Sequence, residues 1–128
     1  EGKEIRLEGE DNFFNCDAAW LSEALGNILK NAMDHTAEGG VITVSWKKRG
    51  GIQNIVIRDN GSGIHPDDIH HIFKRFYRSR FSTDKQGIGL GLPLAKAIID
   101  AHGGTIEAQS ELGRGASFSI NFLIPTKL

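Results

Sequence analysis

Two glycine-rich segments hold the residue types and spacings that could do chemistry. One is Asp59–Ile64, with the sequence DNGSGI, and the other is Gly87–Leu92, with the sequence GIGLGL. Glycine lacks a Cβ, so it tolerates positive φ and lets the backbone come close to a phosphate. Because a carboxylate, Asp59, leads the first segment, the two segments together predict a nucleotide-binding pocket.

A second group of polar residues follows a helical spacing. Asn27 and Asn31 are four residues apart and Glu23 lies one turn earlier, so the three side chains project from the same side of a helix. Amide oxygens there could ligate a magnesium ion that bridges phosphates. The alternative is that these side chains only form a solvated face of the helix. The spacing alone favours this alternative. The presence of the two glycine-rich segments in the same chain favours the magnesium site over the solvated face.

The first long helix must carry these amides. Apolar residues recur at three- and four-residue steps from Ala18 to about Thr36, which predicts one apolar helical face. Asp17 can cap its start, and Gly39 and Gly40 are expected to end it.

Two further helices are expected later in the chain. Pro93 suits the first turn of a helix over Leu92–Ala101, and Gly103 supplies a stop. Pro66 likewise suits the first turn of a short helix that runs to about Phe73. The longer of these helices would begin where the second glycine-rich segment ends.

Six segments have sequences typical of strands, most of them with alternating apolar and polar residues. They are Lys3–Glu8, Asn12–Cys16, Val41–Lys48, Ile52–Arg58, Thr105–Ser110 and Ala116–Ile124. The third and fourth are expected to form a hairpin through the sequence RGG at 49–51. Strands and helices in this order predict an α/β fold, with a mixed, mostly antiparallel sheet packed on one face by helices.

The chain between the two glycine-rich segments has no regular pattern over much of its length. The irregular part begins near Lys74, and Ser79–Gln86 within it is polar. A long loop is uncommon in a compact domain unless it is functional or disordered. We therefore expect a mobile lid at about residues 74–90.

Composition excludes several classes of protein. The chain has 128 residues, which suits a single domain. Its 15 Lys and Arg against 16 Asp and Glu give a net charge of -1, so no overall basic field argues for nucleic acid. No stretch approaches the roughly 20 apolar residues that cross a bilayer. The single cysteine, Cys16, cannot form an internal disulfide, which fits a reducing compartment.

Four motifs, taken in order, resemble those of a known family. They are Asn27-x-x-x-Asn31-Ala32, Asp59-x-Gly61-x-Gly63-Ile64, Ile72-Phe73-x-x-Phe76-Tyr77-Arg78 and Gly87-x-Gly89-x-Gly91-Leu92. They are similar to the N, G1, F and G2 boxes of the ATP-binding catalytic (HATPase) domain of bacterial two-component sensor histidine kinases. The resemblance covers about Ile5 to Ile124 and implies the Bergerat fold, a two-layer α/β sandwich with the nucleotide between helices and lid.

The resemblance implies roles for the matched residues. Asp59 would accept a hydrogen bond from the adenine amino group. Gly61 and Gly63 would let the backbone approach the base, with a structural turn as the alternative. Asn31 would bind magnesium with Asn27 near the phosphates, and these two would be the catalytic residues.

The G2 glycines would offer backbone N–H groups to the phosphates, aided by the positive end of the helix that begins near Leu92. For Phe73 and Phe76, both core filling and anchoring of the lid stay open. Arg78 and Lys85 are candidate phosphate contacts. The implied ATP-binding residues are Asn27, Asn31, His35, Asp59, Gly61, Gly63, Ile64, Phe73, Phe76, Tyr77, Arg78, Lys85, Gly87, Gly89, Leu90, Gly91 and Leu92.

The sequence departs from the family pattern just after the N box. Many of these kinases carry a basic residue and then a tyrosine there, but this chain has Asp34 and His35. Asp34 cannot pair with a phosphate. The contact that a basic residue makes at this position in the family is therefore either supplied by the lid or absent. His35 could still stack on adenine as the tyrosine would.

The implied function is that of a sensor histidine kinase, as its catalytic domain only. It would bind Mg-ATP and donate the γ-phosphoryl group to a histidine on a partner dimerisation domain, so alone it would not autophosphorylate. One alternative is a Bergerat-fold ATP hydrolase, but the water-activating glutamate of such enzymes is replaced here by Asn27, which cannot act as a base. A non-catalytic nucleotide-binding regulatory module is the other alternative.

The resemblance also implies partners and a location. The partners would be the dimerisation and histidine phosphotransfer domain of the same kinase, which residues 1–128 do not contain, and a response regulator. We expect no nucleic-acid partner and no direct membrane insertion. The chain would be a cytoplasmic domain, expected to belong to a membrane-anchored sensor kinase.

Overall fold

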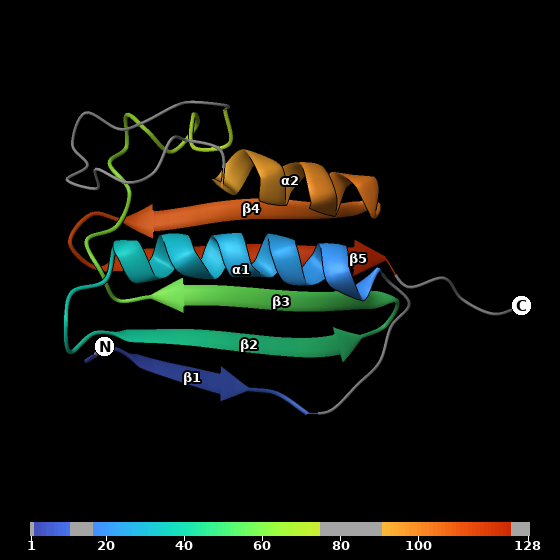
Figure 1. Cartoon of the computed structure of the whole chain (residues 1–128), viewed down its shortest axis with the longest axis horizontal. Helices are drawn as coiled ribbons and strands as arrows, with labels where there is room; N and C mark the ends of the chain where they lie inside the picture. Colours follow the sequence, from blue (N-terminus) through green and yellow to red (C-terminus); the bar gives the residue numbers. More distant parts are fainter. Residues whose placement is uncertain (1, 11–16, 75–90, 124–128) are drawn as a thin grey trace, which may run out of the picture.

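The computed structural model describes residues 2–10, 17–74 and 91–123. Within these residues the chain forms a five-stranded sheet and two α-helices, which lie on the same face of the sheet (Figure 1). The elements are β1 (Glu4–Glu8), α1 (Ala18–Asp34), β2 (Val41–Arg49), β3 (Ile52–Asp59), α2 (Gly91–Ala101), β4 (Gly104–Glu111) and β5 (Gly115–Leu123). The described elements therefore form two layers, as predicted.

The sheet is mixed and mostly antiparallel, which confirms the fold class expected from the sequence. Its strand order is β1-β2-β3-β5-β4. β1 is parallel to β2, and the other three pairings are antiparallel. The parallel pair requires a crossover, which α1 provides in the chain between β1 and β2. The predicted hairpin joins β2 to β3 through Gly50 and Gly51, with Arg49 paired to Ile52.

Helix α1 forms for the reasons that its sequence suggests. The Asp17 side chain accepts a hydrogen bond from the Trp20 N–H at 3.2 Å and so caps the first turn. Its apolar stripe is buried against the sheet and consists of Leu21, Ala24, Ile28 and Ala32. The helix ends at Asp34, about two residues earlier than predicted. Beyond that point the Thr36 N–H bonds to Met33 O, a tighter turn, while Thr36 Oγ1 donates to Ala32 O.

Helix α2 completes the layer beside α1, and the core lies between both helices and the sheet (Figure 1). Pro93 occupies its first turn, and Gly103, at φ +73°, follows its end, as expected. Ala95 and Ile99 face the core from α2, and Phe118 and Ile120 face it from β5. This packing fixes the start of α2 close to the middle of α1.

Some predicted elements are not found or cannot be placed. The short helix expected over Pro66–Phe73 is wrong: that segment is a series of tight turns, closed by hydrogen bonds such as Asp68 N–H to His65 O and His71 N–H to Asp68 O. So short a segment gains too few helical bonds to offset the cost of nucleation. The strand expected over Asn12–Cys16 and the lid expected at 74–90 fall almost wholly outside the described residues.

Among the described residues, no helix has the length and apolar character needed to cross a membrane.

Candidate functional site

Asp59 is the last residue of β3 and is 5% exposed. Its Oδ1 accepts hydrogen bonds from the Gly61 N–H at 2.9 Å and from the Ala116 N–H at 3.4 Å. No described residue donates to its other oxygen, Oδ2. Backbone donors therefore fix the orientation of the carboxylate and leave one oxygen for another partner.

Gly61 brings the loop that follows β3 against the end of α1. A Cβ at Gly61 would collide with the carbonyl oxygen of His35. That oxygen accepts a hydrogen bond from the Ser62 N–H at 3.1 Å. Close backbone packing against the end of α1 therefore requires a glycine at position 61.

Gly63 brings the same loop against the end of β4. It has φ +78°, and a Cβ there would lie 2.6 Å from the carbonyl oxygen of Glu111, at the end of β4. Gly113 in the β4–β5 turn donates its N–H to Ser62 O at 2.8 Å. The loop that follows Asp59 therefore lies between the end of α1 and the β4–β5 turn.

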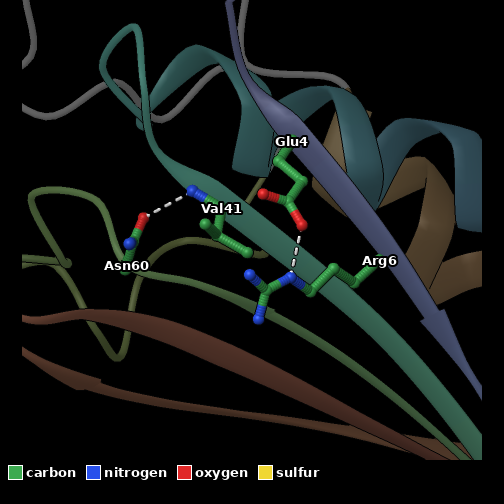
Figure 2. A network of polar contacts seen from close by, with 4 residues as sticks. All are labelled: Glu4, Arg6, Val41 and Asn60. Carbon is green, nitrogen blue, oxygen red and sulfur yellow. Dashed lines mark hydrogen bonds and ion pairs between the residues drawn. The ribbon is translucent and has the colours of Figure 1, made fainter.

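Asn60 ties the same loop to the start of β2, a role that the sequence analysis missed. Its Oδ1 accepts a hydrogen bond from the Val41 N–H at 2.8 Å (Figure 2). Its own N–H donates to Val41 O at 3.2 Å. An asparagine directly after a strand often bonds to nearby backbone, which is the signal that could have revealed it. Figure 2 also shows the surface pair of Glu4 and Arg6 on β1.

Asn27 of α1 lies beside the start of α2. Asn27 Oδ1 lies 3.9 Å from the position that a Cβ on Gly91, the first residue of α2, would occupy. Asn27 Nδ2 is buried and has no hydrogen-bond partner among the residues that the structure describes. Asn31 is half-buried one turn later, whereas Glu23 is exposed. The interface between the helices thus holds an unpaired amide beside a helix N-terminus, where backbone N–H groups are free.

Apolar residues of the predicted site belong partly to the core. Phe73 packs edge-to-face on Phe118, with ring centroids 6.3 Å apart at 81°. Ile64 packs against the core, and Leu92 on α2 is buried within it. Core filling is therefore supported for Phe73.

The residues after the N box lie at the C-terminal end of α1. His35 is half-buried and caps the helix, donating its N–H to Asn31 O at 3.2 Å. Asp34 forms an exposed ion pair with Lys30 at 3.1 Å. His35 thus lies beside the loop that follows Asp59, through the contact of its carbonyl oxygen with that loop.

An open hollow of about 380 Å³ lies beside Asp59. Arg58, Ser117 and Gln109 line it and are paired across β3, β5 and β4. Because side chains alternate along strands, these three point to the sheet face opposite Asp59, away from the helices. Asp59, Ser110 and Ala116 also line the hollow, which therefore adjoins the end of the sheet that carries Asp59.

Several predicted contacts cannot be placed, because they fall between residues 75 and 90, outside the described part of the chain. They are Phe76, Tyr77, Arg78, Lys85, Gly87, Gly89 and Leu90. Of the predicted residues that the structure places, Asp59, Gly61 and His35 lie together at the end of β3, and Asn27 lies beside Gly91 at the start of α2.

Comparison with known proteins agrees with these features. The family model for histidine kinase-, DNA gyrase B-, and HSP90-like ATPases matches residues 16–126. The sensor protein SrrB of Staphylococcus aureus is 36% identical over 114 residues, which are 88% of this chain and 20% of SrrB. The chain thus spans about a fifth of the length of the curated relatives that it matches.

Solved structures of histidine kinases share this fold. The mycobacterial sensor histidine kinase MprB has a TM-score of 0.87 at 27% identity, covering 98% of this chain and 86% of that one. Full-length ShkA in complex with AMPPNP has a TM-score of 0.80 at 28% identity and covers 98% of this chain and 27% of that one. The catalytic domain of histidine kinase ThkA has a TM-score of 0.79 at 25% identity, covering 96% of this chain and 80% of that one. The chain therefore belongs to the family of histidine kinase-, DNA gyrase B- and HSP90-like ATPases, and within that family it is similar to the ATP-binding domains of sensor histidine kinases.

Proposed function

We propose that this domain binds Mg-ATP at the Asp59 end of the sheet and donates its γ-phosphoryl group to a histidine of a partner dimerisation domain. The observation that carries the proposal is the arrangement of Asp59, a buried carboxylate with one oxygen held by two backbone N–H groups and the other without a donor among the described residues. Such a carboxylate can accept a hydrogen bond from the adenine amino group and rejects the carbonyl oxygen that guanine carries there.

The start of α2 supports a phosphate site beside the adenine site. The first-turn N–H groups of α2 have no helical acceptors and carry the positive end of the helix dipole. Gly91 leaves space there, because among the described residues nothing closer than Asn27, at 3.9 Å, meets a Cβ built on it. The triphosphate of ATP would therefore lie between Asn27 and Gly91.

The donor set also fits a magnesium ion. Asn27 and Asn31 present amide groups on one side of α1, and the buried amide nitrogen of Asn27 has no partner in the described part of the chain. Hard cations such as Mg²⁺ take oxygen ligands, including amide carbonyls and phosphates. We assign Asn31 to the ion and Asn27 to the phosphates. When bound, the ion would neutralise charge on the transferring phosphoryl group.

Transfer is favoured over hydrolysis by the chemistry of Asn27. An amide cannot take a proton from water, and Glu23, one turn earlier, is exposed on the helix surface. Catalysis would then rest on positioning and charge stabilisation, which suffice for phosphoryl transfer to a correctly placed nucleophile. Such a nucleophile would be a histidine on the dimerisation domain of the same kinase.

The relatives support this assignment. MprB is described as a sensor histidine kinase, and ShkA was crystallised with AMPPNP, a non-hydrolysable ATP analogue. By analogy the phosphoryl group would pass from the histidine to a response regulator, and the domain would act on the cytoplasmic side of a membrane-anchored kinase. The residues between 75 and 90, Lys85 among them, would contribute the lid of this single catalytic domain.

Calorimetric titration tests the proposal directly. The domain is titrated with a non-hydrolysable ATP analogue and with the matching GTP analogue, each with and without magnesium. We expect adenine-selective binding that magnesium strengthens. Phosphoryl transfer from labelled ATP is then measured after adding a histidine-bearing dimerisation domain of a related kinase. Absence of binding to either analogue would refute a functional pocket and favour a regulatory module.

A further inference from the structure

The hydroxyl of Ser110 connects two segments on which the position of Asp59 depends. Ser110 belongs to β4 and is half-buried. Its Oγ lies 2.5 Å from Ile64 N and 3.3 Å from Ile64 O, in the loop that follows β3. The same atom lies 3.3 Å from Gly115 O, at the start of β5. One hydroxyl therefore contacts both the loop that follows β3 and the start of β5.

Those two segments provide the backbone donors to Asp59. Gly61, in the loop, and Ala116, next to Gly115, both donate their N–H groups to Asp59 Oδ1. The separation of loop and strand therefore sets the orientation of the carboxylate. A hydroxyl that accepts the Ile64 N–H can donate its one hydrogen to Gly115 O, and in this arrangement it links the loop to the strand.

The packing around this contact is tight. A Cβ at Gly115, which has φ +117°, would collide with the carbonyl oxygen of Asp59. A Cβ at Gly63 would lie 3.0 Å from Ser110 Oγ. Backbones that approach so closely depend on specific hydrogen bonds to stay in register, because side chains do not fill the space between them.

We propose that Ser110 is a positioning residue for adenine recognition. It holds the loop at Ile64 against the start of β5, so that two N–H groups fix Asp59 Oδ1 and direct Oδ2 toward the base. Ser110 does not itself contact the nucleotide. This inference rests on the proposed function, and it assigns to β4 and the β4–β5 turn a part in base selection.

The first test compares Ser110→Ala with Ser45→Ala. Ser45 is a half-buried serine of β2 on the opposite sheet face, and its hydroxyl has no hydrogen bond among the described residues. We expect Ser110→Ala to bind the ATP analogue about five- to tenfold more weakly while affinity for the GTP analogue stays the same. Ser45→Ala should bind as the wild type does. An unchanged ratio of ATP to GTP affinity in Ser110→Ala overturns the proposal.

A double-mutant cycle with Asp59→Asn separates positioning from a general structural effect. If Ser110 acts through Asp59, Ser110→Ala should cause no further loss of ATP affinity in the Asp59→Asn background. A loss as large as in the wild-type background overturns the proposal. If Ser110→Ala does not fold by circular dichroism, Ser110→Cys replaces it in both arms, because a thiol keeps the volume and bonds only weakly.

A measurement without nucleotide tests the positioning role of Ser110 independently of ATP binding. In NMR spectra of the free domain, Ser110→Ala should shift the amide signals of Gly61 and Ala116, and Ser45→Ala should not. Unshifted signals overturn the positioning role even if ATP binds. Shifted signals in a domain that does not bind ATP retain the role of Ser110 in orienting Asp59 and instead refute the proposed function.

Discussion

Asp59 combines burial with an uneven set of hydrogen bonds. Its Oδ1 has two backbone donors, and its Oδ2 has none among the described residues. An asparagine at this position could accept the same two bonds through its carbonyl oxygen, but its NH₂ group would face the adenine amino group donor to donor. The role in base recognition can therefore be tested without dismantling the loop.

Asp59→Asn should weaken binding of the ATP analogue while the domain stays folded. A hydrogen bond to a charged group contributes about 1.5–3 kcal/mol, which corresponds to about a 10- to 100-fold change in Kd. Calorimetry gives the affinity and thermal denaturation checks the fold. Asp100→Asn, which changes an exposed carboxylate paired with Lys96 on α2, is the matched control. Equal affinity in the two variants would exclude the assigned role.

Arg6 holds the pKa of Glu4 below its ordinary value, through a side-chain hydrogen bond and through its charge. Because the folded pKa is lowered, the pair stabilises the folded state above the unfolded pKa of Glu4 and loses this effect as pH falls through the folded pKa. Arg6→Ala should return the pKa of Glu4 to its ordinary value, measured by NMR titration of its carboxyl carbon. Arg114→Ala is the control. A pKa of Glu4 that stays low in Arg6→Ala would contradict this prediction.

Residue patterns in the sequence predicted the residues that carry the chemistry of the site better than the residues that hold them in position. Asp59, Gly61 and Gly63 were identified because their types and spacing are specific. Asn60 and Ser110 were missed, since their partners are 19 and 46 residues away in the sequence. A serine in an alternating strand has no local feature that distinguishes a bridging hydroxyl from a solvated one.

At the scale of elements, periodicity predicted the long helices and the described strands closely. α1 and α2 each bury an apolar stripe, and Gly50 and Gly51 turn the β2–β3 hairpin. The error over Pro66–Phe73 arose because a proline and a few apolar residues suit either a short helix or a series of turns. The packing of Phe73 on Phe118 holds this segment against the core.

Two glycines test how α1 and its neighbouring loop fit together. Gly61→Ala should destabilise the domain by about 1–3 kcal/mol, because the new Cβ collides with the His35 carbonyl oxygen at the end of α1. Gly26→Ala, within α1, should be neutral or stabilise by up to about 1 kcal/mol, since a Cβ there meets nothing within 4 Å. Denaturant unfolding measures both. The prediction is wrong if Gly61→Ala is as stable as Gly26→Ala.

At the scale of the whole molecule, the helices cover one face of the sheet (Figure 1). The alternate residues of β3 and β5 that point to the other face are mostly polar. The core between them is almost wholly apolar, but it includes Gln53 of β3, which is 2% exposed. Gln53 Nε2 donates to Lys47 O at 3.4 Å, while its Oε1 has no partner within residues 2–10, 17–74 and 91–123. A buried polar atom without a partner costs stability.

Gln53→Met should therefore stabilise the domain. Methionine has nearly the same shape and removes the unpaired oxygen, so we expect a gain of about 1 kcal/mol in the free energy of unfolding. Gln109→Met, on the exposed face of β4, is the control and should not stabilise. Urea denaturation compares the two variants. A loss of stability in Gln53→Met would show that the amide makes a net favourable contribution.

The sequence by itself determined the class of fold, the order of the described elements and the family, because hydrophobic periodicity and glycine spacing are local properties of the chain. Only the tertiary structure decided what surrounds Asp59. The end of α1, the start of β2 and the β4–β5 turn meet the loop after β3 through hydrogen bonds between residues far apart in sequence. Such contacts follow from sheet order and from the packing of helices on the sheet, so no local pattern in the chain encodes them.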